Sequence, residues 1–252
     1  MSRSCSVNRG NLDARAETRL PAAGIVSREL WSSVLGRWYE RARTLVLRRS
    51  EPASLGYRFM ARLIEREFPR DASGVCLAFS APDSDKASSD ALLMLAYCLR
   101  SELGSRVLIV DARLKGQLDG ITGRLGLGEA QGFAEILRDG IDGHEKIAVA
   151  SSVPNVDVLP SGASQDEPTM PLDRLRLKNL LAAAVARYDY VLLQVSSPLR
   201  DTRALVIAAE ANAMFLLAED NRTFMTTLDE CRKVLLANGV NDVRVVVTGA
   251  RP

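Results

Sequence analysis

Short runs of apolar residues alternate with amphipathic helical patterns along most of this chain, and this alternation constrains the fold more than any other feature. Six runs have the length and the aliphatic content of buried strands. They are Val75–Phe79, Val107–Val110, Val156–Leu159, Tyr190–Val195, Ala213–Ala218 and Val243–Thr248. Continuous apolar runs belong to strands buried on both faces. The sequence therefore predicts an α/β domain in which helices cover both faces of a mostly parallel sheet, as in P-loop NTPases.

The segment from Val75 to Asp90 has the order of a phosphate-binding loop. A strand run is followed by a break at Ser80-Ala81-Pro82, then by Lys86, and then by a helical pattern. Such a loop needs glycines, because bare backbone N–H groups at a helix N-terminus must approach the phosphates closely. Here Asp83 and Asp85 stand where glycines are wanted, and Ala87 stands where a hydroxyl would hold magnesium.

Charge also argues against phosphate binding at this loop. Each carboxylate about 4 Å from a phosphate costs roughly 4 kcal/mol at an effective dielectric of about 20. Lys86 either offsets part of this repulsion or forms a salt bridge with Asp83 or Asp85. The candidate loop, which we expect to be degenerate, consists of Asp83, Ser84, Asp85, Lys86, Ala87 and Ser88.

Polar side chains follow three of the strand runs. Lys86, Asp111 and Gln194 all lie at or just beyond strand ends, where parallel sheets bind ligands. Gln194, at a buried strand end, is expected to form hydrogen bonds inside the site. Arg113 and Lys115 are either an anion site or, as is usual for basic residues after a strand, solvated.

The composition is that of a globular protein, with 47% apolar and 25% charged residues. The four cysteines are scattered without metal-ligand spacing, and Cys76 and Cys98 fall on apolar faces. No apolar run reaches the length of a membrane span, and the N-terminus has no signal-peptide pattern. We therefore expect a cytoplasmic protein.

The first seventy residues differ in charge from the rest. They hold 14 arginines, no lysine and 7 acidic residues, whereas residues 71–252 carry a net charge of −5. Residues 1–26 are polar and small, and we expect them to be disordered. The α/β domain is expected over residues 50–252.

Residues 27–49 have the pattern of a basic amphipathic helix. Its apolar stripe is Leu30, Trp31, Val34, Leu35, Trp38, Tyr39, Ala42, Leu45 and Val46. Tryptophan on one face and arginine on the other is typical of a helix at an anionic membrane surface, and equally of a helix docked on the body or on a partner protein. A second helix is expected from Ala53 to Phe68, with apolar positions at Leu55, Phe59, Leu63, Ile64 and Phe68.

The order of these pieces resembles the cytoplasmic domain of bacterial capsule and exopolysaccharide tyrosine autokinases, within the MinD/ParA-like group of deviant Walker-A ATPases. The resemblance covers about residues 53–250. Its landmarks are Tyr57-Arg58, the Ser80–Ser88 loop, Arg106–Lys115 (RVLIVDARLK), Val156–Gly162 (VDVLPSG) and Tyr188–Gln194 (YDYVLLQ). It implies a P-loop fold at the inner face of the cell membrane, a polysaccharide chain-length or export protein as partner, and possible self-association.

The departures from this family fall on the chemistry that the resemblance implies. The hydroxyl that binds magnesium is replaced by Ala87, the second carboxylate of the Asp-x-Asp motif by Arg113, and the Walker-B aspartate by Gln194. The C-terminal tyrosine cluster is missing. Lys86, Ser88 and Asp111 are retained.

Three hypotheses follow. The first is a pseudokinase or pseudo-ATPase that acts as a scaffold or regulator in exopolysaccharide biosynthesis, with no catalytic residue, no metal and no certain cofactor. ATP or ADP bound without magnesium is compatible with it. The second is an active tyrosine autokinase or ATPase with a reorganised site, in which Lys86 contacts phosphate, Ser88 replaces the missing hydroxyl and Asp111 is the base or metal contact. The third is a MinD/ParA-like positioning regulator. We do not expect DNA to be the partner.

Overall fold

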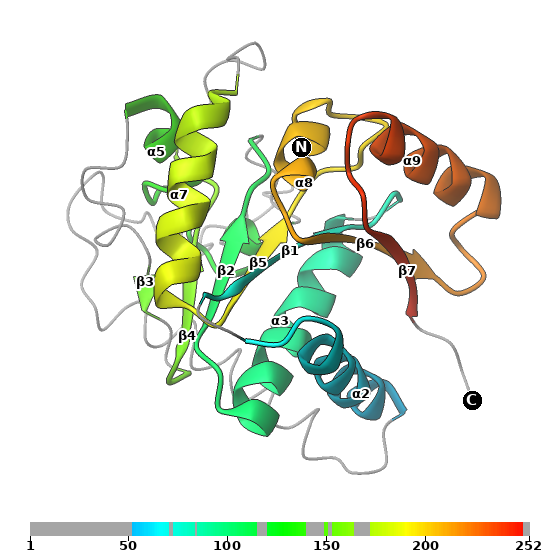
Figure 1. Cartoon of the computed structure of the whole chain (residues 1–252), viewed down its shortest axis with the longest axis horizontal. Coiled ribbons are helices and arrows are strands. Elements are labelled where there is room, and N and C mark those ends of the chain that lie inside the picture. Colours follow the sequence, from blue (N-terminus) through cyan, green and yellow to red (C-terminus); the bar gives the residue numbers. More distant parts are fainter. Residues whose placement is uncertain are drawn as a thin grey trace, which may run out of the picture.

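The computed structural model describes residues 52–70, 73–83, 85–114, 120–139, 149–150, 153–163 and 172–248. A seven-stranded sheet lies at the centre of these residues, with helices on both of its faces (Figure 1). The predicted α/β fold with a mostly parallel sheet is confirmed. The segments 1–26 and 27–49 lie outside the described residues, so the structure does not test what the sequence predicts for them.

The strands follow the apolar runs of the sequence closely. They are β1 (Val75–Ser80), β2 (Val107–Asp111), β3 (Val149–Ala150), β4 (Val156–Leu159), β5 (Tyr190–Gln194), β6 (Ala213–Glu219) and β7 (Val243–Thr248). Their order in the sheet is β3-β4-β2-β5-β1-β6-β7. The two-residue β3, which the sequence did not predict, is antiparallel to β4, and the other pairs are parallel.

Besides Ala53–Phe68, the sequence predicts helices over Phe133–Leu137, Leu172–Arg187, Thr202–Glu210 and Thr223–Asn238. The helices of the structure lie close to the predicted positions, with one exception. They are α2 (Pro52–Glu67), α3 (Asp85–Leu103), α4 (Ile121–Arg124), α5 (Phe133–Asp139), α7 (Arg174–Arg187), α8 (Arg203–Ala209) and α9 (Met225–Ala237). The exception is the four-residue α4, because so short a helix has no periodic pattern. Local signals set several ends: Asp173 Oδ1 accepts hydrogen bonds from the first N–H groups of α7, and Gly239, with φ +86°, follows α9.

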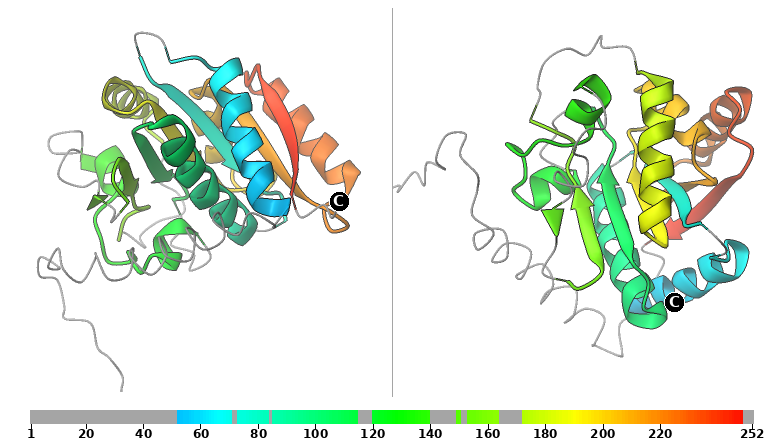
Figure 2. Two further views of the ribbon diagram at one scale, coloured as in Figure 1. Left: turned by 90° about the horizontal axis from the view of Figure 1, so that it is seen from below. Right: turned by 60° about the vertical axis from the view of Figure 1, so that its left-hand side comes forward.

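The sheet has an apolar core on each face, and helices lie over both faces (Figures 1 and 2). Helices α2 and α3 cover one face, where Phe79 of β1 stacks on Phe215 of β6 with ring centroids 5.0 Å apart. Helices α5, α7, α8 and α9 cover the other. Every residue of the central strands β1, β2 and β5 is buried, which explains their unbroken apolar runs.

Helix α2 packs on the body through a different face from the one that the sequence suggested. Ile64 is buried and Phe68 packs against the core, as predicted. Leu55, Phe59 and Leu63 were expected to pack as well, but they are exposed. The contacts to the body come instead from Tyr57, Met60 and Ala61, which lie on the same side of the helix as Ile64.

Three thiols lie in these cores, and burial raises the pKa of Cys76 and Cys98 to about 12 and that of Cys231 to about 11. About one in a thousand of these thiols or fewer is therefore ionised at pH 8. We expect Ellman's reagent at pH 8 to label the native Cys5→Ser variant very slowly, and three thiols to react once urea unfolds it. Rapid labelling of the native variant would contradict the described packing.

Candidate functional site

The candidate site lies where β1, β2 and β5 end side by side. Gln194, the last residue of β5, pairs in register with Phe79 of β1 and with Asp111 of β2. The loop after β1 leads into α3, which carries Lys86, Ser88 and Ser89. The parallel sheet thus brings together the three strand ends that the sequence singled out.

At the end of β2, Asp111 and Arg113 form an ion pair that is shielded from solvent. Asp111 is 0% exposed and Arg113 is 1% exposed. The guanidinium donates from Nε to Asp111 Oδ1 at 2.9 Å and from Nη2 to Asp111 Oδ2 at 3.0 Å. The prediction that Arg113 is solvated is wrong, because its side chain folds back onto the carboxylate two residues earlier instead of extending into water.

A second donor completes the shell around the carboxylate of Asp111. The backbone N–H of Thr122, at the start of α4, donates to Asp111 Oδ2 at 3.0 Å. The hydroxyl Oγ1 of Thr122 accepts a hydrogen bond from the N–H of Ser161 at 2.8 Å. Asp111 thereby fixes α4 beside the strand ends.

Gln194 joins three elements through its side-chain amide. Its Nε2 donates to Ser88 Oγ at 2.7 Å and to Ser89 Oγ at 2.8 Å, and all three residues are buried. Its Oε1 accepts from the N–H of Ile121 at 3.1 Å. An aspartate at this position could not donate these bonds, so the amide ties the first turn of α3 to α4 in a way that a metal-binding carboxylate does not.

Gly120 gives Arg113 the room that it occupies. A Cβ atom at position 120 would overlap the guanidinium of Arg113, which its ion pair holds in place. Neither Gly120 nor Thr122 stood out in the sequence. The sequence around Gly120 has no helical or strand pattern that would mark this glycine as important. Only the structure shows that the missing side chain leaves space for the guanidinium of Arg113.

The residues of the predicted phosphate loop are not all directed into this network. Asp83 and Lys86 are exposed, and Lys86 forms no ion pair with Asp83. Ser88 is buried, with its hydroxyl bound to Gln194. Ala87 is half-buried and packs against the core on the α3 side. Ser84, the side chain of Asp85, and Lys115 lie outside what the structure describes.

The residues at the strand ends do not fit a magnesium ion. Both oxygens of Asp111 are engaged by Arg113, position 194 offers an amide, and position 87 offers no hydroxyl. In the part of the chain that the structure describes, no three histidine, cysteine, aspartate or glutamate residues gather as a metal site would require. The guanidinium of Arg113, which is bonded to both carboxylate oxygens of Asp111, repels a cation that approaches this carboxylate.

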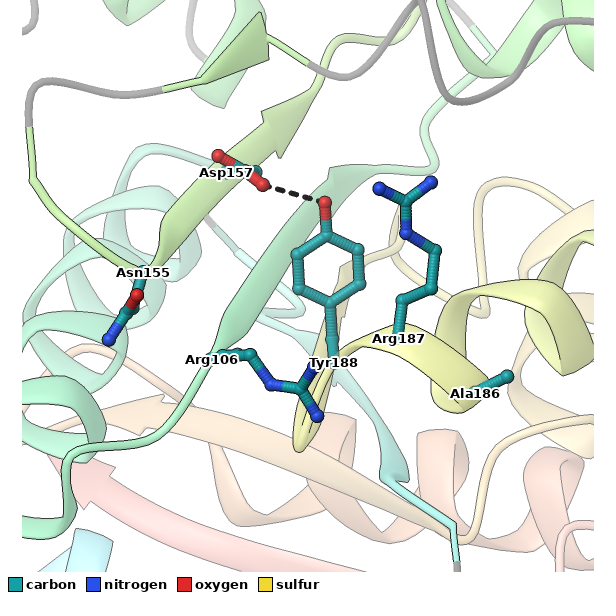
Figure 3. A pocket seen from close by; sticks show the side chains of 6 residues that line it. All are labelled: Arg106, Asn155, Asp157, Ala186, Arg187 and Tyr188. Atoms are coloured by element: carbon teal, nitrogen blue, oxygen red, sulfur yellow. Dashed lines mark hydrogen bonds between the residues drawn. The ribbon is translucent and has the colours of Figure 1, made fainter.

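A separate hollow of about 350 Å³ opens at the opposite edge of the sheet, where β2, β4 and β5 begin (Figure 3). Between its arginines, Tyr188 donates to Asp157 Oδ2 at 2.7 Å, and burial together with this bond raises the pKa of the tyrosine (Figure 3). Arg106, another lining residue, pairs with Asp189 at 3.3 Å. These groups satisfy one another, and the hollow lies away from the strand ends that carry the candidate site.

Comparison with solved structures places the fold. No family model and no curated protein matches the sequence. The kinase domain of the Escherichia coli tyrosine kinase ETK is 18% identical with a TM-score of 0.63, over 78% of this chain and 76% of that chain. The kinase domain of VpsO is 16% identical with a TM-score of 0.63, over 86% of this chain and 99% of that chain.

The described body has the fold of these kinase domains. The cell-division protein MinD of Aquifex aeolicus is also similar, with 14% identity and a TM-score of 0.54, over 69% of this chain and 68% of that chain. At such identities the likeness establishes a P-loop NTPase-like fold and not an activity. The activity has to be argued from the residues of this chain.

The buried ion pair makes a prediction about stability. Asp111→Ala leaves the guanidinium of Arg113 buried without its carboxylate, and we expect the free energy of unfolding to fall by about 3–5 kcal/mol. The double variant Asp111→Leu/Arg113→Met removes both charges, so it should lose less than Asp111→Ala alone. Urea denaturation of the full chain measures both effects.

The exposed pair of Lys233 and Asp229 on α9, 2.6 Å apart, supplies the matched control. Asp229→Ala should cost only about 0.2–1 kcal/mol, because solvent screens that pair. If Asp111→Ala cost no more than Asp229→Ala, the buried pair would not hold the site together.

Proposed function

We propose that this protein is a pseudokinase or pseudo-ATPase that acts as a scaffold or regulator in exopolysaccharide biosynthesis and export, at the inner face of the cell membrane. One observation carries the proposal: the bidentate bond of Arg113 to Asp111 commits the retained carboxylate at this site to an internal partner. Its role is then structural, since it anchors α4 through Thr122.

Phosphoryl transfer requires metal-held phosphates and neutralisation of the charge that develops on the transferred group. Position 87 lacks the hydroxyl, position 113 carries a cation, and position 194 carries an amide that is bound to Ser88 and Ser89. Ser88, the replacement hydroxyl of the active-enzyme hypothesis, is buried and accepts a hydrogen bond from Gln194. These contacts favour a binding protein over a kinase.

The proposed role in polysaccharide biosynthesis rests on the similarity of this chain to tyrosine autokinases in sequence landmarks and in fold. Five sequence landmarks match the capsule and exopolysaccharide tyrosine autokinases in order, and tyrosine kinase domains are among the structures with the same fold. A protein that keeps this core while lacking the catalytic groups can still occupy the kinase's position beside a polysaccharide chain-length or export protein of the membrane. None of the helices that the structure describes is long and apolar enough to cross a bilayer.

Nucleotide binding without turnover belongs to the same proposal. Lys86 is exposed at the start of α3 and makes no ion pair with Asp83, so its ammonium group is accessible to an anion from solvent. ATP or ADP would bind without magnesium, because the metal contacts are committed elsewhere. Such binding would accompany the proposed role without being required for it, so the loss of Lys86 would leave that role intact.

A complementation experiment in the native host tests the proposal. Deletion of the gene should lower the exopolysaccharide yield, and the Lys86→Ala variant should restore it to the wild-type level, because the proposed role needs no phosphoryl transfer. Lys178→Ala, at an exposed lysine of α7, is the matched control, and immunoblotting should show equal protein levels.

Two outcomes would overturn different parts of the proposal. If Lys86→Ala failed to restore the yield while Lys178→Ala restored it, the lysine would be required and a purely structural role would be wrong. If deletion left the yield unchanged, the assignment to exopolysaccharide biosynthesis would be wrong, whatever the state of the site.

A further inference from the structure

Helix α2 has two apolar faces, of which the body covers only one. Ala61 and Ile64 are buried against α3 and the sheet. On another side of the helix, Leu55 is 52% exposed, Phe59 is 66% exposed and Leu63 is 45% exposed. These three residues follow one another at a spacing of four, so they form a continuous exposed stripe about 12 Å long. The ribbon of α2 lies at the outside of the domain (Figure 2).

We infer that this stripe is a docking surface for residues 38–46 of the same chain. The amphipathic pattern of residues 27–49 ends at the break Ser50-Glu51-Pro52, immediately before α2 begins. Two helices joined by so short a connection pack side by side and antiparallel. The segment therefore reaches the stripe with its own apolar face.

The register of such a hairpin matches the apolar residues of the two helices. With the turn at residues 50–51, position 46 faces Leu55, position 42 faces Phe59, and position 38 faces Leu63. These positions hold Val46, Ala42 and Trp38, all of which belong to the apolar stripe of the segment. The largest exposed side chain of α2 thus meets an alanine, and the tryptophan meets a leucine, which is the alternation of large and small residues that lets helices pack closely.

Two other occupants fit this surface less well. Three half-exposed side chains offer far less than the roughly 800 Å² per partner of a stable dimer, whereas a covalently linked segment needs no such area because its local concentration is high. An anionic lipid surface would need unpaired cations beside the stripe. The neighbouring Arg62 pairs with Glu65 at 3.1 Å, and Arg66 pairs with Glu67 at 2.8 Å.

Tryptophan fluorescence of the full chain tests this inference without a label. The chain has two tryptophans, Trp31 and Trp38, and both lie in the segment. The register places Trp38 opposite Leu63 and Trp31 beyond the end of α2. In the otherwise wild-type Trp31→Phe protein, we therefore expect the emission of Trp38 to be blue-shifted and protected from acrylamide, independently of protein concentration. In the same background, Phe59→Ser combined with Leu63→Ser should shift the emission to longer wavelength and increase quenching.

The matched control is Phe224→Ser combined with Leu236→Ser, which removes exposed apolar side chains at α9 and should leave the emission unchanged. Circular dichroism should show that both double variants keep the helical content of the body. The inference is overturned if the α2 variant leaves the emission unchanged. It is also overturned if the blue shift of the Trp31→Phe protein depends on protein concentration, or develops only when anionic vesicles are added.

A cysteine pair tests the register. In a Cys5→Ser background, Ala42→Cys with Phe59→Cys should cross-link within one chain, whereas Arg41→Cys with Phe59→Cys should not. The native thiols of Cys76, Cys98 and Cys231 are buried and do not compete. A cross-linked dimer would show that a second copy covers the stripe, and equal cross-linking of both pairs would show that the register is wrong.

Discussion

The buried ion pair between Asp111 and Arg113 is the contact on which the rest of the candidate site depends. A carboxylate that is wholly buried at a strand end is costly unless its oxygens are bonded, and here the guanidinium and the N–H of Thr122 bond both of them. The close approach of Gly120 to the guanidinium and the position of α4 both follow from that pair. Gln194 extends the network to the first turn of α3 through Ser88 and Ser89.

This network changes what the strand ends can do. In a phosphate-binding site, the polar groups at the carboxyl edge of the sheet face the ligand and its metal. Here the side chains at the same edge bond to other groups of the protein. Of the groups that would hold a cation, Asp111 is bonded to Arg113, and the hydroxyl and the Walker-B aspartate are replaced by Ala87 and Gln194. The fold is P-loop NTPase-like, and the internal contacts at the strand ends support our proposal that the domain acts by binding partners.

The sequence was sufficient for the strands, because β1, β2 and β5 are buried on both faces and their apolar runs have no other explanation. It was also sufficient to predict that Asp111 and Gln194 lie close together, because the carboxyl ends of parallel strands lie at one edge of the sheet. It could not place Arg113, because an arginine after a strand is usually solvated and only the folded turn brings it back to Asp111. Nor could it orient α2, where two apolar faces compete and periodicity alone does not tell which one meets the body.

Whether magnesium has any part in nucleotide binding at these strand ends decides between a site closed by internal contacts and a catalytic one. Calorimetric titration of the purified full chain with ADP and ATP, with and without Mg²⁺ and alongside Lys86→Ala, measures this directly. We expect the same nucleotide affinity, or the same absence of binding, with and without Mg²⁺. The side chains of Asp111 and Gln194 already bond to groups of the protein and do not hold the metal. Binding that strengthens with Mg²⁺ and is lost in Lys86→Ala would show that the site opens to a metal-bound nucleotide, and would contradict this expectation.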